Sequence, residues 1–116
     1  MPQNLDKDGL RSKINSYELF FIDIWGVIHN GLQIFEDSIE VLENLKKNNK
    51  EFVLLTNAPR PNFTVIDFLK KMGLKKFYEH VYTSGEASIK YLIENFQNSK
   101  FYHIGPPRDF DLFKRF

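Results

Sequence analysis

Residues 17–31, with the sequence YELFFIDIWGVIHNG, carry the main signal for the fold. The apolar run LFFI ends at a single carboxylate, Asp23, and two glycines, Gly26 and Gly31, follow shortly after it. A short apolar run that is closed by a turn signal is typical of a strand buried on both faces. In open α/β sheets, ligands bind just beyond the carboxyl ends of such strands. Asp23 is therefore expected to lie where a ligand binds.

The bulk composition excludes several classes of protein. The chain has 116 residues, a net charge of +1 and no cysteine. This length allows one domain at most, and the small net charge predicts no binding to nucleic acid or to a membrane surface. Without cysteine there is no disulfide, thiolate metal site or cysteine nucleophile. The apolar runs are far shorter than the roughly 18 residues of a membrane span, and the first residues lack a signal-peptide core, so we expect a cytoplasmic protein.

Four apolar segments alternate with three segments of helical periodicity along the chain. This β-α-β-α-β-α-β order predicts an α/β fold with a parallel sheet and right-handed crossovers. The strands are expected at residues 18–24, 51–55, 80–82 and 100–104, and the helices after Asp37 and over residues 62–72 and 85–96.

Capping signals accompany two of these helices. Asp37 with Glu40, and Thr83 with Glu86, have the spacing of capping boxes, in which a side-chain oxygen accepts a hydrogen bond from a backbone N–H in the first helical turn. Between the first strand and the first helix, residues 25–35 contain an Asn-Gly pair, which is a strong turn signal. We therefore expect a hairpin-like excursion there.

Polar residues end two consecutive strands of the predicted sheet. Asp23 ends the first strand, and Thr56 and Asn57 follow the second. Neighbouring strands lie about 4.8 Å apart, so residues at their carboxyl ends can converge on one small ligand. A carboxylate that faces a hydroxyl group and free backbone N–H groups is suited to attack on an electrophilic phosphorus atom.

Four segments of the chain together resemble the haloacid dehalogenase (HAD) superfamily. They are FFIDIWGVIHNG, FVLLTNAPRP, YTSGEASIKYL and FYHIGP, and they extend over residues 18–105. The resemblance is greatest to the subclass of sugar-phosphate, nitrophenylphosphate and pyridoxal-phosphate phosphatases, which carries a large cap. It implies a three-layer, Rossmann-like (HAD-like) core and a phosphatase that acts on a small phosphorylated metabolite, such as a sugar phosphate.

The resemblance also implies roles for individual residues. Asp23 matches the nucleophile that forms an aspartyl-phosphate intermediate, and it also matches a ligand of Mg²⁺. The backbone carbonyl of Trp25 matches a second Mg²⁺ ligand. Thr56 matches the hydroxyl group that holds a phosphoryl oxygen, and Asn57 matches a residue whose backbone N–H does the same.

Trp25 departs from the pattern of the phosphatases. At this position they place a second aspartate, which protonates the leaving group and then activates water. An indole has one N–H donor and no proton that titrates near neutrality, so it cannot act as a general acid or base. Loss of such a group costs about 10²–10⁴-fold in rate.

The chain also lacks two further motifs of the superfamily, a lysine and an acidic pair, which lie far beyond residue 116 in its members. Asp109 and Asp111 have the wrong spacing to replace the pair. We therefore interpret residues 1–116 as the N-terminal portion of a HAD-like core, incomplete and without its cap. Residues 1–13 would be a loosely held lead-in and residues 106–116 the start of the cap. Such a core leaves an open sheet edge, through which a homo-oligomer could form.

Two further residues are candidates for contact with substrate, and two other functions stay open. His29 lies near the expected mouth of the site and could supply the missing acid, while Arg60 follows Asn57 closely and could meet a phosphate. A non-catalytic HAD-like domain that binds phosphate or metal, or has a structural role, is the alternative to an enzyme. A receiver-type phosphoacceptor also places an aspartate at a strand end, but the segment DIWG lacks the acidic cluster that such a domain requires.

Overall fold

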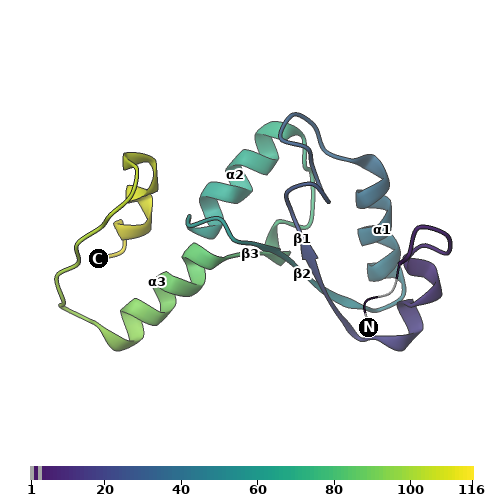
Figure 1. Cartoon of the computed structure of the whole chain (residues 1–116), viewed down its shortest axis with the longest axis horizontal. Helices are drawn as coiled ribbons and strands as arrows, with labels where there is room; N and C mark the ends of the chain where they lie inside the picture. The colour runs from purple at the N-terminus through teal and green to yellow at the C-terminus, as the bar shows by residue number, and fades with distance from the viewer. Residues whose placement is uncertain (1, 3) are drawn as a thin grey trace.

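The computed structural model describes residue 2 and residues 4–116. Its centre is a parallel sheet of three strands in the order β1-β2-β3, joined by helices (Figure 1). The α/β class and the parallel sheet are therefore confirmed. The elements are β1 (Leu19–Asp23), α1 (Glu36–Lys47), β2 (Glu51–Thr56), α2 (Asn62–Met72), β3 (Val81–Thr83) and α3 (Ser84–Asn95), with short 3₁₀ helices η1 (Leu10–Ser12), η2 (Ile14–Ser16), η3 (Tyr78–His80) and η4 (Pro107–Phe113).

One face of the sheet carries the hydrophobic core. Side chains that point to this face pack against α1 and α2 and exclude water, which is the main favourable contribution to folding. Leu54 in the central strand is 0% exposed, as is Leu69 in α2. The buried members of the core are Ile24, Ile28, Leu42, Leu45, Phe52, Leu54, Leu69, Leu74, Phe77 and Val81.

The opposite face of the sheet is apolar but exposed. Leu19 and Phe21 in β1 are 48% and 68% exposed, and Leu55 in β2 is 42% exposed. A third layer of the fold would lie on this face. The outer edge of β1 also has no partner strand among the described residues, and its pairing with a second copy of the chain stays a prediction.

The predicted fourth strand is wrong. Residues 100–104 have no regular structure, and Tyr102 and Ile104 are 92% and 90% exposed. A strand exists only where it pairs, and residues 100–104 pair neither with β1 nor with β3, the two edge strands of the sheet. The chain beyond α3 instead folds back so that η4 lies beside α3, on the side of β3 (Figure 1).

The predicted capping box at Asp37 is also wrong. Helix α1 begins at Glu36, with Phe35 as its N-cap residue and no side-chain hydrogen bond to the cap. The Ser38 hydroxyl group donates to the Val27 carbonyl, and the Phe35 N–H donates to the Ile28 carbonyl at 2.8 Å. These tertiary bonds to the preceding loop fix where the helix begins.

The other two helices agree with the sequence pattern. Helix α2 spans Asn62–Met72 as predicted and ends at Gly73, whose φ of 111° is in the left-handed region that glycine adopts readily. Helix α3 begins directly after Thr83, whose side chain accepts a hydrogen bond from the Glu86 N–H at 2.9 Å. None of the helices within residues 4–116 is long and apolar enough to cross a bilayer.

Replacing Leu54 with alanine tests the importance of the buried sheet face. We expect the Leu54→Ala variant to lose about 2–5 kcal/mol of unfolding free energy, because it leaves a cavity between the sheet and the helices. Leu55→Ala is the matched control, since the neighbouring side chain points to the exposed face. Urea denaturation measures both variants, and an equal loss of stability would contradict the one-sided core.

Candidate functional site

Asp23 is the last residue of β1 and is exposed at the carboxyl edge of the sheet. Its Oδ1 accepts a hydrogen bond from the Ile24 N–H at 2.8 Å. In the parallel register, Asp23 lies opposite Leu55, so the next residue of β2 is Thr56. The carboxyl ends of the two strands are therefore adjacent, and the convergence of their polar residues on one ligand stays a prediction.

The loop after Asp23 forms the predicted hairpin-like excursion. The Gly26 N–H donates to the His29 carbonyl at 2.7 Å, and His29 forms isolated bridges with Trp25 and with Ile34. The Ile24 carbonyl accepts a hydrogen bond from the Ile28 N–H at 2.8 Å. These hydrogen bonds pair backbone N–H and carbonyl groups within the loop and fix its conformation directly after Asp23.

Trp25 lies on the surface of this loop, where the residue is 64% exposed. The ring passes directly over Gly31, and a Cβ atom built on Gly31 would lie 2.6 Å from the indole Cη2 atom. Gly31 also has a φ of 91°, which side chains rarely adopt. The packing of the indole against residue 31 therefore depends on glycine at that position.

His29 lies beneath the indole and is buried, with 3% of its surface exposed. Its ring packs edge-on against Trp25 and Phe68, at centroid distances of 5.1 and 5.7 Å. The Nδ1 atom accepts a hydrogen bond from the Gly31 N–H at 2.8 Å, and burial lowers the pKa of the imidazole. In this geometry a neutral ring, with its proton on Nε2, supports the loop. The role of His29 as an acid or a substrate contact stays a prediction.

Thr56 and Asn57 form the second part of the site. The Thr56 Oγ1 atom accepts a hydrogen bond from the Ala58 N–H at 3.2 Å, and Asn57 is exposed. The carbonyl groups of Asn57 and Ala58 accept hydrogen bonds from Ser84 at the start of α3. Two carbonyl groups of this loop are thus hydrogen-bonded to the start of α3. The Thr56 hydroxyl group lies at the end of β2 and accepts from within the loop.

The N-termini of α2 and α3 interlock through three residues. The Glu86 Oε2 atom accepts a hydrogen bond from the Asn62 N–H, and the Asn62 Oδ1 atom accepts one from the Thr83 N–H, each at 3.0 Å. Arg115 pairs with the other Glu86 oxygen at 2.7 Å. Burial alone would raise the pKa of Glu86, but the Asn62 N–H and the Arg115 guanidinium outweigh it and lower the pKa. The capping-box spacing predicted Thr83 with Glu86, but nothing in the sequence predicted the contribution of Asn62.

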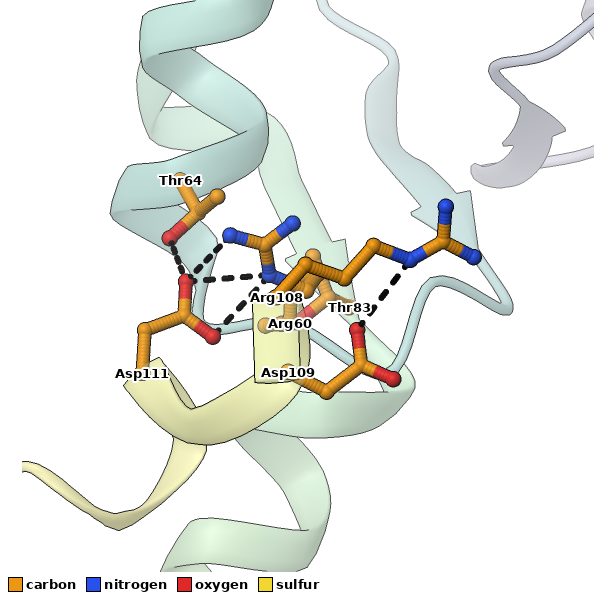
Figure 2. A network of polar contacts seen from close by, with 6 residues as sticks. All are labelled: Arg60, Thr64, Thr83, Arg108, Asp109 and Asp111. Atoms are coloured by element: carbon orange, nitrogen blue, oxygen red, sulfur yellow. Dashed lines mark hydrogen bonds and ion pairs between the residues drawn. The ribbon is translucent and has the colours of Figure 1, made fainter. Parts of the chain in front are cut away.

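Arg60 is paired with Asp111 of η4 (Figure 2). The Nε and Nη2 atoms of the guanidinium donate to the two carboxylate oxygens at 2.9 and 2.7 Å, and the Thr64 hydroxyl group donates to Asp111 Oδ2 at 2.6 Å. The hydrogen bonds from Arg60 lower the pKa of Asp111. In this structure the Arg60 guanidinium binds a carboxylate of the chain itself, and its contact with a phosphate stays a prediction.

The oxygen donors for Mg²⁺ are few. The Asp23 carboxylate and the Trp25 carbonyl are close in sequence at the strand end, and both are of the type that Mg²⁺ prefers. Among residues 4–116, however, no group of three or more His, Asp or Glu side chains is arranged to hold a metal ion. Mg²⁺ is octahedral and keeps several waters, so these two donors are compatible with it but do not by themselves complete a site.

Comparison with models of known protein families decides the family. Residues 20–116 match the model of the haloacid dehalogenase-like hydrolases. The chain belongs to this HAD-like hydrolase family. Its described residues thus form part of a HAD core.

Individual relatives include enzymes that act on phosphate esters. The chain is 25% identical over 93 residues to the 5′-nucleotidase YutF of Bacillus subtilis, which covers 79% of this chain and 36% of that protein. A HAD-like hydrolase from Brucella suis is 28% identical, with a TM-score of 0.75, over 98% of this chain and 40% of that one. The 4-nitrophenylphosphatase of Thermotoga maritima is also 28% identical, with a TM-score of 0.73, over 88% and 40% of the two chains. This chain therefore spans less than half the length of these relatives.

Replacing Gly31 with alanine tests the support of the indole. We expect the Gly31→Ala variant to shift the fluorescence emission of Trp25, the only tryptophan, because the added Cβ atom would displace the ring. Gly73→Ala is the control, since Gly73 has a similar positive φ but no heavy atom within 4 Å of the added Cβ. Both variants should lose about 1 kcal/mol of stability or more. An unchanged emission spectrum in Gly31→Ala would contradict the packing of Trp25 on Gly31.

Proposed function

We propose that this chain forms the phosphoryl-binding part of a phosphatase that acts on a small phosphorylated metabolite. The observation that carries the proposal is the parallel register of β1 and β2, which puts Asp23 next to the end of β2, where Thr56 and Asn57 follow. The similarity to a 5′-nucleotidase and to a 4-nitrophenylphosphatase supports phosphate esters as the substrate class.

The proposed reaction begins with the Asp23 carboxylate. One of its oxygens, Oδ1, is held by the Ile24 N–H, which leaves Oδ2 to attack phosphorus. A new bond forms between the carboxylate and phosphorus, the bond to the ester oxygen breaks, and the alcohol leaves with a proton from solvent or from another group. Water then attacks the aspartyl phosphate, which releases phosphate and restores the carboxylate.

The phosphoryl oxygens carry negative charge throughout this reaction and need hydrogen-bond donors. The Thr56 hydroxyl group and the Asn57 N–H are the donors that we propose. Mg²⁺, held by the Asp23 carboxylate and the Trp25 carbonyl, would neutralise part of this charge when bound.

Trp25 limits the choice of substrate under this proposal. Because the indole cannot protonate a leaving group, the chain should favour esters whose alcohols leave readily as anions. A nitrophenyl ester has such a leaving group, whereas a sugar phosphate does not. The preference for an acidic leaving group is a consequence of the residue two positions after the proposed nucleophile.

The second candidate is a domain that binds phosphate without turning it over. Trp25 in place of an acid, and the absence of a cluster of three metal-binding side chains among residues 4–116, favour this alternative. It predicts the same contacts between the phosphoryl group and Asp23, Thr56 and Asn57, but no release of an alcohol. Binding of inorganic phosphate with Mg²⁺ in a calorimeter, together with an absence of turnover, would support it.

Turnover of p-nitrophenyl phosphate in the presence of Mg²⁺ tests the enzymatic proposal. A version that also carries the lysine and acidic motifs of the family should release p-nitrophenol, and Asp23→Asn in it should abolish this activity, because an amide cannot act as the nucleophile. Asp67→Asn, at an exposed carboxylate on α2, is the control and should keep full activity. Activity that survives in Asp23→Asn would exclude Asp23 as the nucleophile, and a wild type that binds phosphate but is inactive would favour the non-catalytic alternative.

A further inference from the structure

The first turn of α3 is fastened to the loop that follows β2. The Ser84 Oγ atom lies 2.9 Å from the Asn57 carbonyl oxygen and 3.0 Å from that of Ala58. The Gly85 N–H donates to the Ala58 carbonyl at 3.2 Å. A helix that begins 28 positions later in the chain thus engages the two carbonyl groups directly after Thr56 (residue 56 to residue 84).

Glycine at position 85 allows this close contact. A Cβ atom built on Gly85 would lie 2.4 Å from both the nitrogen and the carbonyl oxygen of Arg60. The start of α3 therefore touches the backbone of the loop, and no side chain separates them. The Thr83 hydroxyl group donates to the Arg60 carbonyl on the same side of the loop. Together these contacts leave the loop little freedom to rotate its peptide groups.

The peptide group between Asn57 and Ala58 transmits this contact to Thr56. A trans peptide is planar, so its carbonyl and its N–H point in opposite directions. Here the Asn57 carbonyl accepts from Ser84, and the Ala58 N–H on the other side of the same plane donates to Thr56 Oγ1 at 3.2 Å. Because a hydroxyl group has one proton, an oxygen that accepts from Ala58 still has that proton to donate elsewhere.

We infer that Ser84 is a positioning residue for the phosphoryl contact of Thr56, an inference that rests on the proposed function. The Ser84 hydroxyl group sets the orientation of the Asn57–Ala58 peptide, and this peptide fixes the Thr56 oxygen as an acceptor. The Thr56 proton is then directed to a phosphoryl oxygen. Ser84 itself does not touch the substrate.

The same helix offers a matched control for Ser84. Ser88 is exposed like Ser84, and its hydroxyl group donates to a backbone carbonyl, that of Ser84, at 2.9 Å. Ser88 does not contact the loop after β2 through this bond. Replacing either serine with alanine removes one hydroxyl group from an exposed position of α3, and alanine is the best helix former.

The experiment measures the dissociation constant of inorganic phosphate, with Mg²⁺ present, by calorimetry on the whole chain. We expect Ser84→Ala to weaken binding about three- to tenfold, the effect of losing one ordinary hydrogen bond. Ser84→Thr, which keeps a hydroxyl group, should bind as the wild type does, and Ser88→Ala should stay within about twofold of it. In a Thr56→Ala background, Ser84→Ala should cause no further loss, because its effect passes through the Thr56 hydroxyl group.

A readout without ligand accompanies this measurement. In ¹H–¹⁵N spectra, Ser84→Ala should shift the amide signal of Ala58, and Ser88→Ala should leave it unchanged. Equal effects of the two alanine variants would overturn the positioning role. So would a loss of phosphate affinity from Ser84→Ala in the Thr56→Ala background that is as large as the loss in the wild-type background. If the wild type binds phosphate and Thr56→Ala weakens it, that result leaves the proposed function intact. A wild type that does not bind phosphate overturns the proposed function, and the role of Ser84 with it.

Discussion

Parallel hydrogen bonding between β1 and β2, in the register that sets Asp23 opposite Leu55, is the constraint on which the site depends. Burial keeps this register, because a shift of one residue would turn every side chain of a strand to the other face. Leu54 would then leave the core, where it is 0% exposed, and Leu55 would enter it. The same hydrophobic packing that stabilises the fold therefore aligns the carboxylate with the residue that precedes Thr56.

The strand ends alone do not fix the loops that follow them. The loop after Asp23 is held by its own backbone bonds and by His29 beneath the indole of Trp25. The loop after Thr56 is held from outside, by hydrogen bonds from Thr83, Ser84 and Gly85 to its backbone carbonyl groups. A flexible loop would lose entropy when it orders around a phosphoryl group, whereas a loop that is already held loses less.

The sequence predicted those parts of the fold that depend on local patterns. Asp23 and Thr56 were identified as strand ends because a short apolar run that ends in a polar residue is visible in the local sequence. The bounds of α2 were predicted correctly from its helical periodicity and from Gly73. The strand at residues 100–104 was predicted wrongly because a short apolar run does not show whether it pairs with another strand, and this one pairs with none. Arg60 and Asp111 are 51 positions apart, so their ion pair depends on the tertiary fold and has no local signal. The capping box at Asp37 failed for a similar reason, since the contacts of Ser38 and Phe35 with the preceding loop set the start of α1.

Phosphate binding at the carboxyl edge of the sheet is the central claim about this chain. The most direct test is to map which backbone amide signals move in ¹H–¹⁵N spectra when inorganic phosphate is added with Mg²⁺. We predict that the shifts concentrate at residues 23–26 and 56–58, which follow different strands but lie at one edge of the sheet. Shifts confined to Arg60, Thr64 and η4, or no shifts at all, would contradict it.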